Sequence, residues 1–163
     1  MKKITFLTLL SFLTLTSIAQ NKLGHINAQE ILILMPEFKN AEIKLQDYQM
    51  SLQKQLESSY AEYQEKEQEF KSNESGYDEL VKNDKIAAIQ DLITRIQKFE
   101  KDAQNQIQQK ELDLLTPINK KLKDAIKEVA SEGNYTYIFT SEILHHSAES
   151  NDIGPLVKKK LKL

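Results

Sequence analysis

Hydrophobic residues recur every three or four positions over most of the chain, which is the period of an amphipathic helix. The first run extends from residue 37 to about residue 73 and contains neither Gly nor Pro. Its apolar positions are Phe38, Ala41, Leu45, Tyr48, Leu52, Leu56, Tyr60, Tyr63 and Phe70. The spacing is that of a coiled-coil seam with one four-residue stutter, which locally unwinds a supercoil.

A second amphipathic run extends from about residue 84 to residue 132. Its seam positions are Ile86, Ile89, Ile93, Ile96, Phe99, Ala103, Ile107, Leu114, Ile118, Leu122, Ala125 with Ile126, and Val129. The polar stretch SNESGYDE, residues 72–79, separates the two runs. This arrangement predicts an antiparallel helical hairpin. The alternative is one continuous helix through Gly76, because a single Gly costs a helix only about 1 kcal/mol.

Two breaks modify the second run. Pro117 removes a backbone donor, but the apolar period resumes after it, so we expect a kink rather than a helix end. Gly133 and Asn134 then predict the end of the helix, with the glycine in the left-handed conformation.

The period changes to two in residues 135–140, YTYIFT, which is typical of a β-strand. We expect Tyr135, Tyr137 and Phe139 to face one side of this strand. Residues 143–146, ILHH, could return as its hairpin partner, and residues 23–27, LGHIN, are the other strand candidate. The helical hairpin would bring residues 23–27 next to residues 135–140.

Short helices are expected beside these strands. Residues 28–34 would place Ile31 and Leu34 on one face, and Pro36 suits the first position of the long helix that follows. A last helix would begin at Gly154 and Pro155. The fold class is therefore mainly α with a small β body and a long antiparallel coiled-coil arm.

A body of two or three strands and one short helix has a small core that is marginal by itself. We therefore expect the chain to complete this core with other copies of itself. The candidate residues for the shared body are Ile26, Tyr135, Tyr137, Phe139, Ile143 and Leu156.

Residues 1–19 have the layout of a secretory signal peptide: a positive start, an apolar stretch, and small residues Ser17 and Ala19 before Gln20. An uncleaved anchor is the alternative, but the apolar stretch is shorter than the roughly 20 residues of a membrane span. The predicted organisation is a signal peptide at 1–19, body segments at 20–36 and 133–163, and the arm at 37–132. The chain has no cysteine, which excludes lipidation at cysteine and disulfides.

Cleavage removes two lysines and leaves 20 basic and 24 acidic residues, a net charge of −4. An exported acidic chain is not expected to bind nucleic acid. The histidines are His25, His145 and His146, and no arrangement of residues supports catalysis, a metal site or a phosphate loop. No enzyme activity and no cofactor are therefore predicted.

The tyrosines of the first run, Tyr48, Tyr60 and Tyr63, are expected to pack in the seam. Four apolar residues near the Gly76 turn are instead candidates for exposed contact sites: Phe70, Tyr77, Leu80 and Val81.

Three segments carry a resemblance to a known family: LGHINAQEIL near the start, LLTPINKKLKDAIKEVASEGNYTYIF, and NDIGPLVKKKL near the end. With the long hairpin between them, they resemble the Skp/OmpH family of periplasmic chaperones. The resemblance implies a homotrimer shaped like a jellyfish, with a shared body and three arms around a cavity. That cavity would hold unfolded outer-membrane proteins and prevent their aggregation without ATP.

The chain departs from the family in its charge. The best-known members are strongly basic, whereas this mature chain is acidic, which puts a lipopolysaccharide site in doubt. Binding of a membrane surface through the short tail KKKLKL is the weaker interpretation. The main alternative to a chaperone is a structural or adaptor coiled-coil protein of the cell envelope, whose arms act as a spacer or bind one folded partner.

Overall fold

The computed structural model describes residues 21–163, which fall into two compact units. The hairpin unit comprises residues 29–123, and the strand unit comprises residues 21–28 together with 124–162. The predicted signal peptide at 1–19 lies outside the described residues. The prediction of a mainly helical chain with a small sheet is confirmed.

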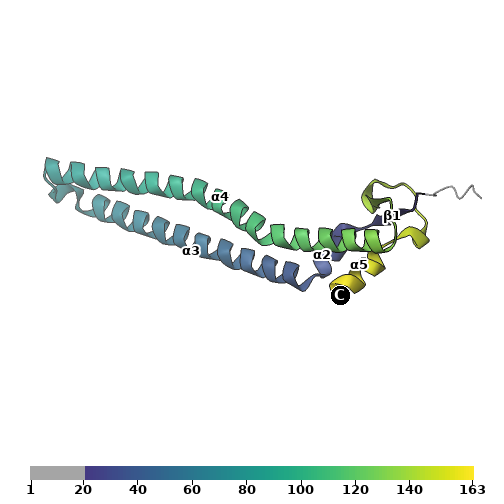
Figure 1. Cartoon of the computed structure of the whole chain (residues 1–163). Coiled ribbons are helices and arrows are strands. Elements are labelled where there is room, and N and C mark those ends of the chain that lie inside the picture. Colours follow the sequence, from purple (N-terminus) through teal and green to yellow (C-terminus); the bar gives the residue numbers. More distant parts are fainter. Residues whose placement is uncertain (1–20) are drawn as a thin grey trace, which may run out of the picture. The chain divides into compact units, whose positions relative to one another are not determined.

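The hairpin unit is built from two long helices, α3 (Pro36–Asn73) and α4 (Glu79–Glu132), after the short helix α2 (Ala28–Leu34). α3 and α4 lie side by side and run in opposite directions (Figure 1). Polar pairs join them along their length: Glu37 with Lys121, Tyr48 with Gln106, and Glu69 with Lys85. The predicted hairpin is confirmed, and the alternative of one helix through Gly76 is wrong.

The turn between the long helices consists of a 3-10 turn, η2 (Glu74–Gly76), followed by Tyr77 and Asp78. The carboxylate of Asp78 accepts a hydrogen bond of 2.8 Å from the backbone N–H of Val81, which caps the start of α4. α4 therefore begins at Glu79, earlier than the apolar period predicted. Gly76 lies in the predicted turn, but its φ is not positive and a Cβ there would meet no atom within 4 Å.

The seam on α4 differs from the predicted one: Leu92 is buried in place of Ile93, and the predicted seam residue Ile86 is exposed as well. Leu92 is 2% exposed, whereas the predicted seam residue Ile93 is 36% exposed. Both side chains are apolar, so the sequence offers two candidates and the partner helix decides between them. The remaining buried residues of α3 and α4 in this unit are Ala41, Leu52, Ile96, Ile118 and Leu122.

Two further predictions about the hairpin unit need correction. Tyr60 lies at the edge of the seam and is exposed, because its hydroxyl donates a hydrogen bond of 2.9 Å to the Glu100 carboxylate. In α2, Leu34 was predicted to share the buried face with Ile31, but Leu34 is exposed. The residue buried beside Ile31 is Leu32.

α4 continues through Pro117 as one helix and bends along its course (Figure 1). The prediction that Pro117 does not end the helix is confirmed. Among the helices within residues 21–163, none combines the length and the apolar character that a membrane crossing requires.

The strand unit holds a two-stranded parallel sheet of β1 (Leu23–Ile26) and β2 (Tyr137–Thr140). Leu23 pairs with Tyr137, and the register continues to Ile26 with Thr140. On its other side β1 meets the segment after the 3-10 turn η4 (Glu149–Asn151), where the N–H of Ile153 donates to the carbonyl of His25 at 3.0 Å. The predicted pairing of the two strands is confirmed.

Residues 143–146 do not return along β2 as a hairpin partner, so that prediction is wrong. The chain instead forms a 3-10 turn, η3 (Ser141–Ile143), directly after β2. Both ends of the segment 141–148 are hydrogen-bonded to the side chain of His25 on β1. These bonds draw the segment toward β1 instead of along β2.

The C-terminus of α4 is closed by a Schellman motif. Asn134 has a positive φ of 53°, and the N–H of Tyr135 donates to the carbonyl of Ala130 at 2.9 Å. The prediction that Gly133 takes the left-handed position is therefore wrong. Gly133 is needed for space, because a Cβ there would lie 2.4 Å from the ring of Tyr135.

The last helix, α5 (Gly154–Leu161), begins where Asp152 accepts a hydrogen bond of 2.8 Å from the N–H of Gly154. The buried apolar residues of the strand unit are Ile26, Ala125, Val129, Ile153 and Val157. This core is small, as the sequence predicts.

Leu92 and Ile93 provide a test of the seam. Replacing Leu92 by Ala should lower the free energy of unfolding by about 2–5 kcal/mol, because it leaves a cavity between the helices. Replacing Ile93 by Ala should cost much less, because that side chain is already partly in water. Urea unfolding followed by far-UV circular dichroism at one fixed protein concentration measures both. Equal losses for the two variants would contradict the observed seam.

Candidate functional site

The candidate functional sites of this chain are exposed apolar surfaces. Within residues 21–163, no group of three or more His, Asp or Glu side chains is placed to hold a metal ion. His145 and His146 are exposed and lie in the segment after η3. The features that stand out are apolar side chains left in water on both units.

The strand unit exposes four of the six residues predicted to form a shared body. Tyr137 is 58% and Ile143 66% exposed, and Phe139 and Leu156 are also exposed. Tyr137 and Phe139 lie on the same face of β2, with their ring centroids 6.3 Å apart. Burying two aromatic rings is energetically favourable, and here the rings remain in water. This face is therefore suited to binding a partner that covers it.

The other two body candidates pack within the chain itself. Ile26 is buried. Tyr135 lies outside β2, beside Gly24 and Gly133, and the ammonium of Lys22 lies 4.1 Å from the centre of its ring. Lys22 also donates a hydrogen bond of 2.8 Å to the carbonyl of Gly133, which places a cation at the C-terminus of α4. Tyr135 therefore joins the start of the strand unit to the end of α4.

A shallow groove of about 440 Å³ lies in the strand unit beside Leu156. Val129 and Leu156 form its apolar part. Lys160 borders it and pairs with Glu132 at 2.6 Å and with Glu128 at 2.9 Å. The hydrogen bonds to these two carboxylates raise the pKa of Lys160 above its usual value.

His25 is a buried polar residue whose hydrogen bonds the sequence analysis did not predict. It is 9% exposed, and its Nε2 lies 3.1 Å from the carbonyl of Ala148 while its Nδ1 lies 3.2 Å from the hydroxyl of Ser141. A carbonyl can only accept, so Nε2 donates, and in the neutral ring Nδ1 accepts from the Ser141 hydroxyl. His25 thus tethers the segment that carries the exposed Ile143.

The four contact candidates near the turn divide into two pairs. Phe70 and Tyr77 are half-buried against each other, with ring centroids 6.1 Å apart. Lys85 lies over Tyr77 and pairs with Glu69 at 2.8 Å, and this hydrogen bond lowers the pKa of Glu69 and raises that of Lys85. Leu80 and Val81, by contrast, are exposed.

Four exposed apolar residues of the hairpin unit were not named by the sequence analysis: Ile33, Ile43, Met50 and Leu112. Ile43 and Met50 are seven residues apart and therefore lie on the same face of α3. An apolar residue outside the heptad seam is the feature of the sequence that could have identified these exposed positions.

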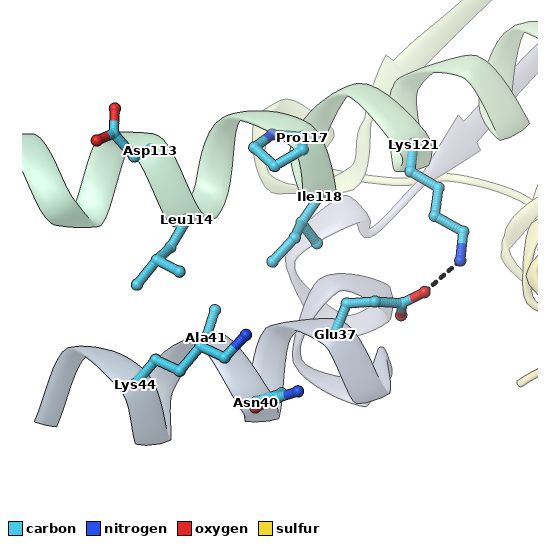
Figure 2. A pocket seen from close by; sticks show the side chains of 9 residues that line it. All are labelled: Glu37, Asn40, Ala41, Lys44, Asp113, Leu114, Pro117, Ile118 and Lys121. Atoms are coloured by element: carbon cyan, nitrogen blue, oxygen red, sulfur yellow. Dashed lines mark hydrogen bonds and ion pairs between the residues drawn. The ribbon is translucent and has the colours of Figure 1, made fainter. Parts of the chain in front are cut away.

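A groove of about 380 Å³ lies between α3 and α4 beside Pro117 (Figure 2). Leu114 and Ile118 point from α4 toward Ala41 on α3. The ion pair of Glu37 with Lys121 borders it, and the hydrogen bond from Lys121 lowers the pKa of Glu37. The groove adds apolar surface to the hairpin unit beside Pro117.

The structure thus defines a class of protein: a long helical hairpin combined with a small parallel sheet that exposes apolar side chains. The family model "Outer membrane protein (OmpH-like)" matches residues 22–161, and the chain belongs to this family. The fold is also that of a solved candidate OmpH-like outer membrane chaperone from Caulobacter crescentus. The two align with a TM-score of 0.78 at 12% identity, over 88% of this chain and 85% of the other. A comparison with curated proteins gives no match.

The tether formed by His25 can be tested with a pair of substitutions. His25→Ala should leave the Ser141 hydroxyl and the Ala148 carbonyl without their partner, at a cost of about 1–3 kcal/mol, and loosen residues 141–148. His25→Phe keeps a buried ring and should loosen the segment as well. Hydrogen exchange of the amides in residues 141–148 measures the effect. Unchanged protection in both variants would show that other contacts hold the segment.

Proposed function

We propose that the protein is an ATP-independent holdase chaperone of the periplasm that binds unfolded outer-membrane proteins and prevents their aggregation. In this proposal three chains assemble through their strand units, and their helical arms enclose the client. Membership of the OmpH-like family supports a chaperone role. The Caulobacter protein of the same fold is itself named as a candidate outer membrane chaperone.

The observation that carries the proposal is apolar surface left in water by an otherwise strongly polar chain. Charged residues make up 28% of the chain and its mean hydropathy is −0.52. Nevertheless, large apolar side chains stay exposed on β2, on α3 and on α4. Single exposed apolar residues are normal on a folded protein, but the aromatic pair Tyr137 and Phe139 on β2 and the neighbours Leu80 and Val81 on α4 form contiguous apolar surface, which supports a role in binding.

Self-association is supported by the strand unit. Its described residues comprise two paired strands, the short helix α5 and the end of α4 around a small core, and they leave Tyr137 and Phe139 exposed on one face. Sheets of two strands are marginal in water unless something covers them. A second and third copy would supply that cover and complete the core.

Client binding is supported by the hairpin unit. Its exposed apolar residues are distributed over both helices among charged side chains, singly at Ile43, Met50 and Leu112 and as an adjacent pair at Leu80 and Val81. Each contact with an unfolded chain would be weak, but several contacts in one cavity raise the overall affinity through effective concentration. Weak individual contacts also allow release without nucleotide hydrolysis.

Phe139 tests the assembly step. Phe139→Ala should cost the assembled protein roughly 3–5 kcal/mol and dissociate the trimer, because the ring would be buried only between chains. Leu112→Ala, which removes an exposed apolar side chain from the hairpin unit, is the matched control and should leave the assembly intact. Sedimentation equilibrium at several concentrations reports both, and unfolding of the native protein should depend on concentration. A wild-type protein that is a stable folded monomer would refute the trimer.

Aggregation of a client tests the chaperone step. An outer-membrane β-barrel protein is diluted from urea with or without the mature protein, and light scattering is followed. We expect suppression of scattering that weakens only modestly as salt rises, because apolar contacts supply most of the binding. An inert protein at equal mass is the control.

Two results would contradict this expectation. If the mature protein does not suppress scattering at any salt concentration, the chaperone function is refuted and the spacer or adaptor role remains. If suppression disappears at moderate salt, the protein is a chaperone that binds through charge, and the apolar mechanism is refuted.

A further inference from the structure

The turn end of the hairpin unit presents two apolar side chains at the start of α4. Leu80 is 72% exposed and Val81 is also exposed, although both lie within the first turn of the helix. The aromatic residues nearby do not cover them, because Phe70 and Tyr77 pack against each other instead. Leu80 and Asp84 are four residues apart and therefore lie on the same face of α4.

The charges around this apolar pair are not balanced. Residues 74–85 contain two lysines and four acidic residues. Lys82 pairs with Glu74 at 2.9 Å and Lys85 pairs with Glu69 at 2.8 Å, so both ammonium groups are already bound. The hydrogen bond to Glu74 raises the pKa of Lys82, and the nearby charge of Glu79 adds to this effect.

The carboxylates of Glu79 and Asp84 lie near the start of α4, and the charge of Lys82 interacts with that of Glu79. Within the described residues, Glu79 and Asp84 form no ion pair, and both are exposed. Asp78 is engaged differently, as the cap of α4. The apolar pair is therefore bordered by negative charge that a partner could neutralise.

We propose that this tip surface, defined as Glu79, Leu80, Val81 and Asp84, selects client segments that combine apolar side chains with lysine or arginine. The inference rests on the proposed holdase function and specifies which segments of an unfolded chain the arm ends bind. Charge complementarity chooses this partner, because an acidic apolar segment would bring like charges together at Glu79 and Asp84.

The apolar and charged residues of the tip surface have separate roles. Leu80 and Val81 supply contact area, whereas Glu79 and Asp84 discriminate between segments by the sign of their charge. Exposed ion pairs are weak, so the preference for a cationic segment should be about three- to ten-fold in Kd. It should shrink as salt screens the charges. Such a preference is compatible with binding that depends mainly on apolar contacts.

Two labelled peptides that represent client segments test the inference, each measured with the full-length mature protein. One alternates valine and phenylalanine with lysine, and the other is identical except that glutamate replaces each lysine. Fluorescence anisotropy at low salt should show the lysine peptide binding about three- to ten-fold more tightly. The double variant Glu79→Gln, Asp84→Asn should bring the two affinities together, while Leu80→Ser should weaken binding of both peptides.

The matched control is the double variant Glu42→Gln, Asp47→Asn. It makes the same change of charge at exposed positions of α3 and should leave the preference unchanged. Equal affinities of the unmodified protein for the two peptides, or the same loss of preference in the control, would overturn the inference. Suppression of client aggregation in light scattering, measured in parallel, reports on the holdase function itself. A protein that suppresses aggregation but does not discriminate the peptides retains that function and refutes only the charge selection.

Discussion

The parallel pairing of β1 with β2 is the constraint on which the rest of the chain depends. Two parallel strands cannot be joined by a tight turn, because the chain must return to the same end of the sheet before the second strand begins. Here the return consists of α3 and α4, so the connection between the paired strands is itself the helical hairpin. Lys22 and Gly133, 111 residues apart in sequence, are held by a hydrogen bond just outside this pair.

This topology has a consequence for stability. Closing a long loop costs conformational entropy, and the pairing of two short strands contributes little free energy to offset that cost. The helices of the connection reduce that cost, since an antiparallel hairpin directs the chain back toward its start. The pair is further supported by the side chains around it: Tyr135 fills the space beside Gly24 and Gly133, and Ile153 donates a backbone hydrogen bond to the carbonyl of His25. The strand unit is thus held together by segments distant in sequence.

The amphipathic period predicts the two long helices, the hairpin and the partner of β2, because each depends on patterns that extend over many residues. The predictions that were wrong concern positions whose conformation or burial depends on contacts between a few atoms. Leu92 and Ile93 are both apolar, and only the neighbouring helix distinguishes them. Asn134 rather than Gly133 takes the left-handed position, and Gly133 instead leaves room for the ring of Tyr135. Residues 143–146 have strand character, but two hydrogen bonds from His25 override it.

The candidate surfaces were less predictable than the fold, since exposure depends on which apolar residues find partners. Of the six body candidates, Ile26 and Tyr135 are used within the chain, while Tyr137, Phe139, Ile143 and Leu156 stay exposed. Near the turn, Phe70 and Tyr77 contact each other and leave Leu80 and Val81 exposed. In both cases the apolar pattern of the sequence identifies the group of candidate residues. Packing in the folded chain then decides which of them are buried and which remain available to a partner.

The distribution of this exposed surface differs between the two units. On β2, Tyr137 and Phe139 are fixed by the strand at a ring separation of 6.3 Å, which presents one continuous apolar face. A continuous face of fixed geometry suits a partner that always has the same shape, such as another copy of the chain. On α3 and α4 the exposed residues Ile43, Met50 and Leu112 stand singly among polar and charged side chains, and Leu80 and Val81 form one small pair. Under the proposed holdase function, such small separate contacts would suit clients of varied sequence, because no single arrangement is required, and the charges between them would favour solubility of the arms when no client is bound.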